Sequence, residues 1–205
     1  MKICITWVLS LVSLTSVSQT ISHVDFITGS RFLYDDFIEG TVYFDDNTQA
    51  ADLPMRLNLF HDELQYLKND SMYALATPSR FDKITIGGEA FVYLDESYDS
   101  DLAGFVKMWN AQLPAIVTKM RIELREGDYY YAIPPRFERD DDQHYFMRAE
   151  NDIVEIKSVK HLIYLLSYYS PELEEFAEKE KISSTSGADL AWLVEYHRKI
   201  EAKTE

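Results

Sequence analysis

Cysteine is almost absent from this sequence, and its scarcity excludes several kinds of chemistry. The single cysteine, Cys4, lies within an apolar N-terminal stretch and not at its end, so it is poorly placed to receive a lipid. If that stretch is removed, the remaining chain has no thiol. Disulfide stabilisation, thiol catalysis and cysteine-ligated metal sites are then excluded.

Positive charge is also scarce, because 20 Lys and Arg residues stand against 35 Asp and Glu residues. The formal net charge is -15 at pH 7. Such an excess repels nucleic-acid phosphate and anionic lipid surfaces, so we predict no nucleic-acid partner. The acidity is typical of a soluble protein and also fits a cation ligand or a basic partner.

Familiar catalytic and cofactor motifs are missing as well. No Gly-x-Ser-x-Gly sequence supplies an activated serine, and no Lys-Ser or Lys-Thr follows Gly87-Gly88 as a phosphate loop requires. The pair His61-Asp62 is interpreted as a hairpin turn rather than half of an acid–base pair. The sequence therefore predicts no cofactor and assigns no catalytic residue.

The N-terminus has the three-part layout of a secretory signal peptide. Lys2 is followed by an almost wholly apolar run, and Ser16-Val17-Ser18 offers small residues before a cut at Gln19. We predict a signal peptide over residues 1–18 and a periplasmic or extracellular protein without membrane insertion after cleavage. The apolar run is short for a transmembrane helix, although an uncleaved anchor remains an alternative.

The stretch from Gly40 to Leu94 has the pattern of an antiparallel β-meander. Met55, Leu57 and Leu59 alternate with other side chains, which is the period of a strand with one buried face. Turn signals separate the strand-like runs, and they are His61-Asp62 as a two-residue loop, Asn69-Asp70, and Gly87-Gly88. Gly40 is predicted to form a bulge.

The second half of the chain changes period. Further strands are predicted over residues 104–110, 115–124, 129–133, 144–148 and 153–157. Apolar residues then recur at three and four positions, and Ser158, Ser170 and Ser186 are predicted to cap three successive helices. We predict an α+β fold, with an antiparallel β-meander sheet or partly closed barrel over residues 19–157 and about three helices over residues 158–205.

Two runs resemble a pattern of uncharacterised secreted or envelope proteins of Bacteroidetes bacteria. The first runs from Pro54 to Leu67 and the second from Ile84 to Tyr93, with Gly40 to Phe44 also fitting. The resemblance covers about residues 37–94 and, loosely, the helical tail. It implies an exported β-rich domain with a helical end, and it implies no activity or catalytic residue.

The candidate binding residues come from the strands and from a tyrosine cluster. Arg56 and Asn58 lie on the strand face opposite Met55 and Leu57, where they line a groove or hold the strand register. Tyrosines form either a glycan- or peptide-binding platform or ordinary packing. The candidate binding residues are Arg56, Asn58, Tyr66 and Tyr130.

The run Arg139 to His144 is a candidate cation site through Asp140, Asp142 and His144. It lacks the glycine and the distal glutamate of a calcium loop, so an exposed acidic turn is the favoured interpretation. We therefore expect an exported, non-enzymatic envelope protein that binds a protein or a glycan. The alternatives are a calcium-stabilised module and a hydrolase that uses a pair of carboxylates, with Glu138 or Asp140 acting together with Asp142.

Overall fold

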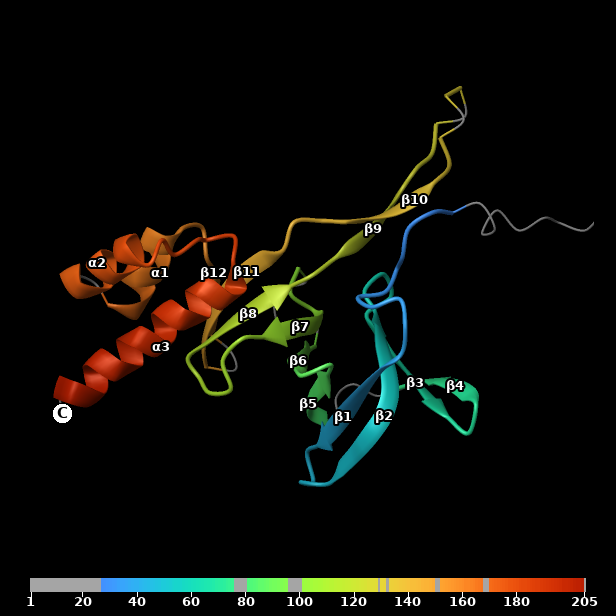
Figure 1. Cartoon of the computed structure of the whole chain (residues 1–205), viewed down its shortest axis with the longest axis horizontal. Helices are drawn as coiled ribbons and strands as arrows, with labels where there is room; N and C mark the ends of the chain where they lie inside the picture. The colour runs from blue at the N-terminus through green and yellow to red at the C-terminus, as the bar shows by residue number, and fades with distance from the viewer. Residues whose placement is uncertain are drawn as a thin grey trace, which may run out of the picture.

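The computed structural model describes residues 27–75, 81–95, 101–128, 130–131, 133–149, 152–167 and 170–204 (Figure 1). The predicted signal peptide, residues 1–18, lies outside them. The strands are β1 (Ile38–Phe44), β2 (Gln49–Asn58), β3 (Glu63–Lys68), β4 (Ser71–Ala74), β5 (Phe81–Ile86), β6 (Glu89–Leu94), β7 (Gly104–Met108), β8 (Ala115–Lys119), β9 (Ile122–Arg125), β10 (Arg136–Arg139), β11 (Gln143–Ala149) and β12 (Asp152–Glu155). The helices are α1 (Val159–Leu166), α2 (Pro171–Lys179) and α3 (Gly187–Thr204).

Ten of the strands form one antiparallel sheet in the order β12-β11-β8-β7-β6-β5-β1-β2-β3-β4. The sheet is open, because β12 and β4 are its two edges and do not pair with each other. The predicted α+β fold is confirmed, with an open sheet in place of the barrel alternative. Among the described residues, no helix is long and apolar enough to cross a membrane.

The sheet is built from two meanders rather than one. Strands β1 to β4 follow one another, and so do β5 to β8, but β5 returns to pair with β1. That pairing aligns Gly40 with Ile86 and Val42 with Ile84. The register of β1 against β2 shifts between Gly40 and Val42, so the predicted irregularity at Gly40 is confirmed.

The hairpin turns follow the local sequence with one correction. Asn69 and Asp70 both have positive φ, as do Gly87 and Gly88, which matches the two predicted two-residue turns. The predicted two-residue loop at His61-Asp62 is wrong, because four residues, 59–62, separate β2 from β3. The longer loop forms because the Asn58 side-chain Oδ1 accepts backbone N–H groups from two loop residues at 3.2 and 3.3 Å.

Strands β8 and β11 continue beyond the sheet as a two-stranded arm, which Figure 1 shows leaving the sheet on the side away from the helices. The strand predicted over residues 115–124 is broken at Met120 and Arg121, where β8 ends and β9 begins. The strand predicted over residues 129–133 is wrong. Asp128 bridges Ile133 at the end of the arm, and the described residues between them, Tyr130 and Tyr131, form a turn.

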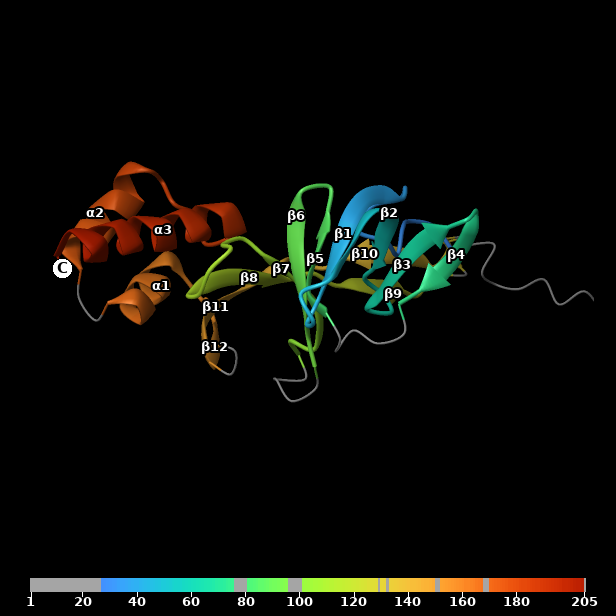
Figure 2. The ribbon, with the colours of Figure 1, turned by 90° about the horizontal axis from the view of Figure 1, so that it is seen from below.

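The three helices pack together at the end of the sheet that contains β8 and β11 (Figure 2). Ser158 and Ser170 cap α1 and α2 as predicted, and the Ser186 hydroxyl accepts a hydrogen bond from the backbone N–H of Asp189 at the start of α3. Leucine and alanine side chains from all three helices share one core with Ile116 and Phe146 of the sheet. A second core lies along β1 to β7 and includes Met120, Ile122 and Phe137 from the base of the arm.

Candidate functional site

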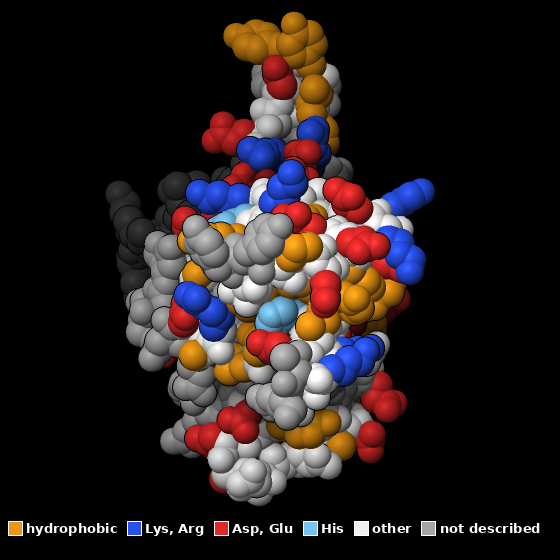
Figure 3. All heavy atoms as spheres, turned by 90° about the vertical axis from the view of Figure 1, so that its left-hand side faces the viewer, with side chains coloured by type: hydrophobic (Ala, Val, Ile, Leu, Met, Phe, Trp, Pro, Cys, Tyr) orange, Lys and Arg blue, Asp and Glu red, His pale blue; other side chains and the backbone are white. Residues whose placement is uncertain are grey.

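The arm formed by β9 and β10 is the most prominent feature of the surface. Figure 3 shows it standing clear of the body, with charged side chains along its length and hydrophobic ones at its end. The two strands are in register over four pairs, from Arg136 opposite Arg125 to Arg139 opposite Ile122. We call residues 122–139 the arm and residues 128–134 its tip.

The base of the arm is fixed to the body by both apolar and backbone contacts. Ile122 is buried, and Phe137 packs against the large sheet core and meets Phe60 edge to face at 5.2 Å. On the other side of β10, the N–H of Phe137 donates to the Thr28 carbonyl at 2.8 Å. The Thr28 N–H in turn donates to the carbonyl of Pro135 at 3.0 Å. These contacts hold the direction of the arm.

The arm carries opposite charges on one face because residues at alternate positions of a strand point the same way. Arg125 lies directly opposite Arg136, and Glu123 directly opposite Glu138. Each arginine of these like-charge pairs forms an ion pair with a glutamate on its own strand. Arg125 lies 3.2 Å from Glu123, and Arg136 lies 3.3 Å from Glu138. These pairs are about half-exposed, so each contributes little to stability.

The tip presents aromatic rings to solvent on a defined backbone. The Asp128 Oδ1 accepts the backbone N–H groups of Tyr130 and Tyr131 at 2.9 and 3.3 Å, and Asp128 exchanges two backbone hydrogen bonds of 2.9 Å with Ile133. Tyr130 is 95% exposed and Tyr131 is 77% exposed. Ile133 and Leu124 are exposed too, so the arm exposes a group of large apolar side chains.

The structure does not bring the four sequence-predicted binding residues together. Arg56 and Asn58 share one face of the sheet, Tyr66 pairs with Met55 on the other face, and Tyr130 lies at the tip of the arm. Asn58 is buried and shapes the loop after β2. The sequence-based prediction therefore included Tyr130 at the tip of the arm, but it did not include the turn that exposes this residue.

Arg56 contacts residues from two separate parts of the fold. Its guanidinium lies 3.7 Å from the ring centre of Phe32 and 4.4 Å from that of Phe37, a cation–π arrangement with both rings. Its Nε donates to the Gln65 Oε1 at 3.1 Å. Burial lowers the pKa of Arg56, and the nearby charge of Arg31 lowers it further. These contacts join the segment before β1 to β2 and β3.

The residues of the predicted cation site have separate partners. Asp142 accepts three hydrogen bonds from Arg139, Asp140 lies 3.3 Å from Arg125, and buried His144 shares a 2.7 Å hydrogen bond with Thr118. In the described part of the chain, no group of three His, Cys, Asp or Glu side chains is placed to hold a metal ion. The same carboxylates line an open depression, and Asp140 and Asp142 are each paired with an arginine.

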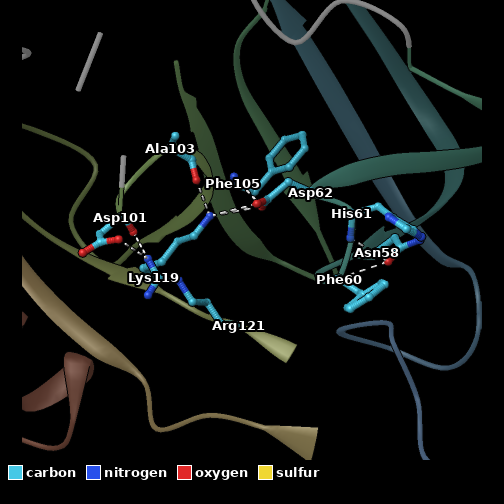
Figure 4. A network of polar contacts seen from close by, with 9 residues as sticks. All are labelled: Asn58, Phe60, His61, Asp62, Asp101, Ala103, Phe105, Lys119 and Arg121. Carbon is cyan, nitrogen blue, oxygen red and sulfur yellow. Dashed lines mark hydrogen bonds and ion pairs between the residues drawn. The ribbon is translucent and has the colours of Figure 1, made fainter. Parts of the chain in front are cut away.

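A buried lysine lies at the centre of a polar network (Figure 4). The Lys119 side chain is 3% exposed, and its Nζ lies 3.1 and 3.2 Å from the two carboxylate oxygens of Asp62 and 2.6 Å from the carbonyl oxygen of Ala103. The same carboxylate accepts the N–H of Phe105 at 3.1 Å. Gly104 has a φ of +103°, and a Cβ there would collide with the Asp62 carboxylate.

This network explains why the loop after β2 lies against β7 and β8. Burial lowers the pKa of Lys119, whereas the charge and hydrogen bonds of Asp62 raise it in part. The Lys119 ammonium group has three hydrogen-bond acceptors, the two carboxylate oxygens of Asp62 and the carbonyl oxygen of Ala103. The lysine therefore has a structural role. Sequence reasoning missed it, because a lysine at the end of a largely apolar strand was the only signal and its partner lies 57 residues away.

A second polar cluster joins the segment before β1 to β6 and β7. The Tyr34 hydroxyl and the Lys107 ammonium both donate to the carboxylate of Glu89. Burial raises the pKa of Tyr34, and the hydrogen bond and charge of Glu89 raise it further. Burial also raises the pKa of Glu89, but the hydrogen bonds from Lys107 and Tyr34 outweigh it and keep that pKa below its usual range.

Comparison of the chain with protein-family models, with curated proteins and with solved structures found no significant match.

Proposed function

We propose that this chain is an exported envelope protein that binds a protein or glycan partner through the tip of its arm. The observation that carries the proposal is the exposure of Tyr130 and Tyr131 on a capped turn at the end of a fixed hairpin. Export rests on the apolar run and small residues of positions 1–18.

Tyrosine suits such a contact because it joins a large apolar ring to a hydroxyl that donates and accepts hydrogen bonds. Its side chain has few rotatable bonds, so little conformational entropy is lost when a partner covers it. A ring of this kind packs into a pocket of a protein or stacks on the apolar face of a sugar. Exposure of two such rings side by side has no role in the packing of the described core.

The geometry of the arm supports a preorganised contact. The tip is held by the side chain of Asp128, and the base is held by Ile122, Phe137 and the backbone of Thr28. A partner therefore meets a surface whose shape is already set, and less free energy is lost to ordering on binding. The opposite charges along β9 and β10 are paired with one another, so this part of the arm adds little to the electrostatic field around the tip. Recognition by shape is therefore favoured over attraction by charge.

The test compares a Tyr130→Ser/Tyr131→Ser double variant with the wild type. The readout is saturable binding of the labelled protein to isolated cell envelopes and to an array of glycans. We expect the double variant to bind at least about tenfold more weakly, because loss of a buried aromatic contact costs about 2 kcal/mol. The control is Tyr164→Ser, which removes an exposed tyrosine from α1, away from the arm.

Equal binding of the double variant and the wild type would contradict a role for the tip. Export is tested separately by mass spectrometry of the N-terminus after expression with its own first residues. A cut before Gln19 in an extracytoplasmic fraction is the expected result, and full-length protein retained in the cytoplasm would contradict export.

A further inference from the structure

The edge strand β4 also presents large apolar side chains to solvent. It has the sequence Ser-Met-Tyr-Ala, with no charge and no proline. Met72 is 56% exposed and Tyr73 is 46% exposed. Edge strands of soluble proteins are usually protected by charge, proline or a bulge, because an open edge pairs readily with another strand.

The opposite edge of the sheet is protected in this way. Strand β12 begins with Asp152 and ends with Glu155, and Asp152 forms an ion pair with Arg148 at 2.8 Å. Ile153 of the same strand packs against a core cluster. The two edges therefore differ in kind, and β4 is the one suited to accept a strand.

The hydrogen-bonding phase of β4 follows from its pairing with β3. The N–H of Leu75 donates to the Leu64 carbonyl at 2.9 Å, so the pair Leu64–Leu75 is a hydrogen-bonded pair. Such pairs alternate along an antiparallel ladder. The register Tyr66–Tyr73 and Leu67–Met72 then turns the backbone of Tyr73 toward β3 and the backbone groups of Met72 and Ala74 outward. No described strand lies beyond β4 to take them.

The side chains of β4 continue a row that begins in the core. Tyr66 packs against the large sheet core, and Tyr73 stacks on Tyr66 with ring centres 5.5 Å apart and an interplanar angle of 23°. The row stops at Tyr73, because β4 is the edge strand of the sheet. A further aromatic ring placed beside Tyr73 would extend the row without a change in the fold.

We propose that β4 pairs antiparallel with β4 of a second copy of this chain, so that two sheets join into one across a twofold axis. An isologous strand pair must match outward-facing residues with outward-facing residues. Met72 of one copy then lies opposite Ala74 of the other, and Tyr73 lies opposite Tyr73 at the axis. This register gives four backbone hydrogen bonds and a row of four tyrosines, two from each copy.

A second copy fits this edge better than a charged segment of another protein. The register brings together Ser71 and Leu75, Met72 and Ala74, and Tyr73 with itself, so no charged residue faces another. The Tyr73 pair is non-hydrogen-bonded, which places the two Cα atoms about 4.5 Å apart and the rings in contact. A strand of this length buries a small area, so the dimer forms in a concentration-dependent way.

The test is sedimentation equilibrium of the purified full chain over a wide range of concentration, for the wild type, Tyr73→Lys and Tyr73→Glu. We expect a dimer for the wild type and monomers for each variant alone, because like charges then meet at the axis. An equimolar mixture of the two variants is expected to regain the dimer, since lysine then faces glutamate. Tyr164→Lys, a charge placed on α1, is expected to leave the dimer intact.

The register is tested by cross-linking in a Cys4→Ser background. Tyr73→Cys is expected to form a disulfide between copies, because the paired Cα atoms lie within bonding range. Met72→Cys is expected to form none, since Met72 lies two positions from its own copy across the axis. A wild type that stays monomeric at every concentration, or a mixture that fails to associate, would overturn the proposal. Tyr130→Ser/Tyr131→Ser is expected to dimerise normally, which separates this interface from binding at the arm.

Discussion

Removal of the Asp62 carboxylate is the sharpest test of how this fold is held together. In Asp62→Ala, the Lys119 ammonium stays buried beside Ala103 without its counter-charge, and the N–H of Phe105 loses its acceptor. Breaking a buried ion pair from one side typically costs 3–5 kcal/mol. The Asp62 side chain is 34% exposed, so water reaches part of the site, and we expect a loss of about 3 kcal/mol.

The assay is urea unfolding at neutral pH, followed by circular dichroism. With a slope of about 2 kcal/mol/M, the expected loss moves the unfolding midpoint down by about 1.5 M. The matched control is Asp62→Ala/Lys119→Met, in which an apolar side chain of similar length replaces the lysine. We expect it to recover about half of the loss, because no charge is then left buried.

The pH dependence gives an independent check on the same pair. The pKa of Lys119 lies below its ordinary value of 10.5 in the folded state, so the unfolded chain binds more protons between the two values and stability rises with pH there. Loss of Asp62 lowers that folded pKa further. The loss in free energy of unfolding caused by Asp62→Ala should therefore become smaller as the pH approaches 10.5. A variant that loses less than about 0.5 kcal/mol, or a double variant no more stable than the single one, would refute the reasoning.

Two further predictions concern the other polar cluster and the helices. The pKa of Tyr34 in the folded state is raised above its ordinary value of 10.0, so its contribution to the free energy of unfolding is present below that pH and is lost as the pH rises above it. In urea titrations, Tyr34→Phe should therefore lose less stability above pH 10.0 than the wild type does. Leu173 of α2 is fully buried, and Leu173→Ala should destabilise the whole protein by about 3 kcal/mol in one cooperative transition, whereas Glu174→Ala on the exposed face should change stability by less than about 0.5 kcal/mol. A separate early transition for Leu173→Ala would show that the helices unfold apart from the sheet.

Local patterns in the sequence were enough for the secondary structure in much of the chain. The turns at Asn69-Asp70 and Gly87-Gly88 and the caps at Ser158 and Ser170 depend on neighbouring residues, and each is found where it was predicted. The return of β5 to β1 was not predicted, because pairing between distant segments leaves no local signal. The arm was missed because its two strands are short and charged on one face. The run from 129 to 133 also has a strand-like composition, although its described residues Tyr130 and Tyr131 form a turn.

The candidate site was predicted in part for the same reason. Tyr130 was selected for its chemistry, but its exposure depends on the Asp128 turn and on Phe137 at the base of the arm. Arg56 is held between two rings from a segment about 20 residues away, which alternation along β2 does not reveal. Lys119 and Asp62 form a pair only because the loop after β2 reaches across β7.

The continuity of β8 with β9 and of β10 with β11 has a mechanical consequence. A force applied to the tip of the arm is transmitted along both strands of the arm into β8 and β11 of the sheet. Those two strands pair with each other and lie between the edge strand β12 and β7. Tension on the arm would therefore be borne by the ladders that join β8 to β7 and β11 to β12.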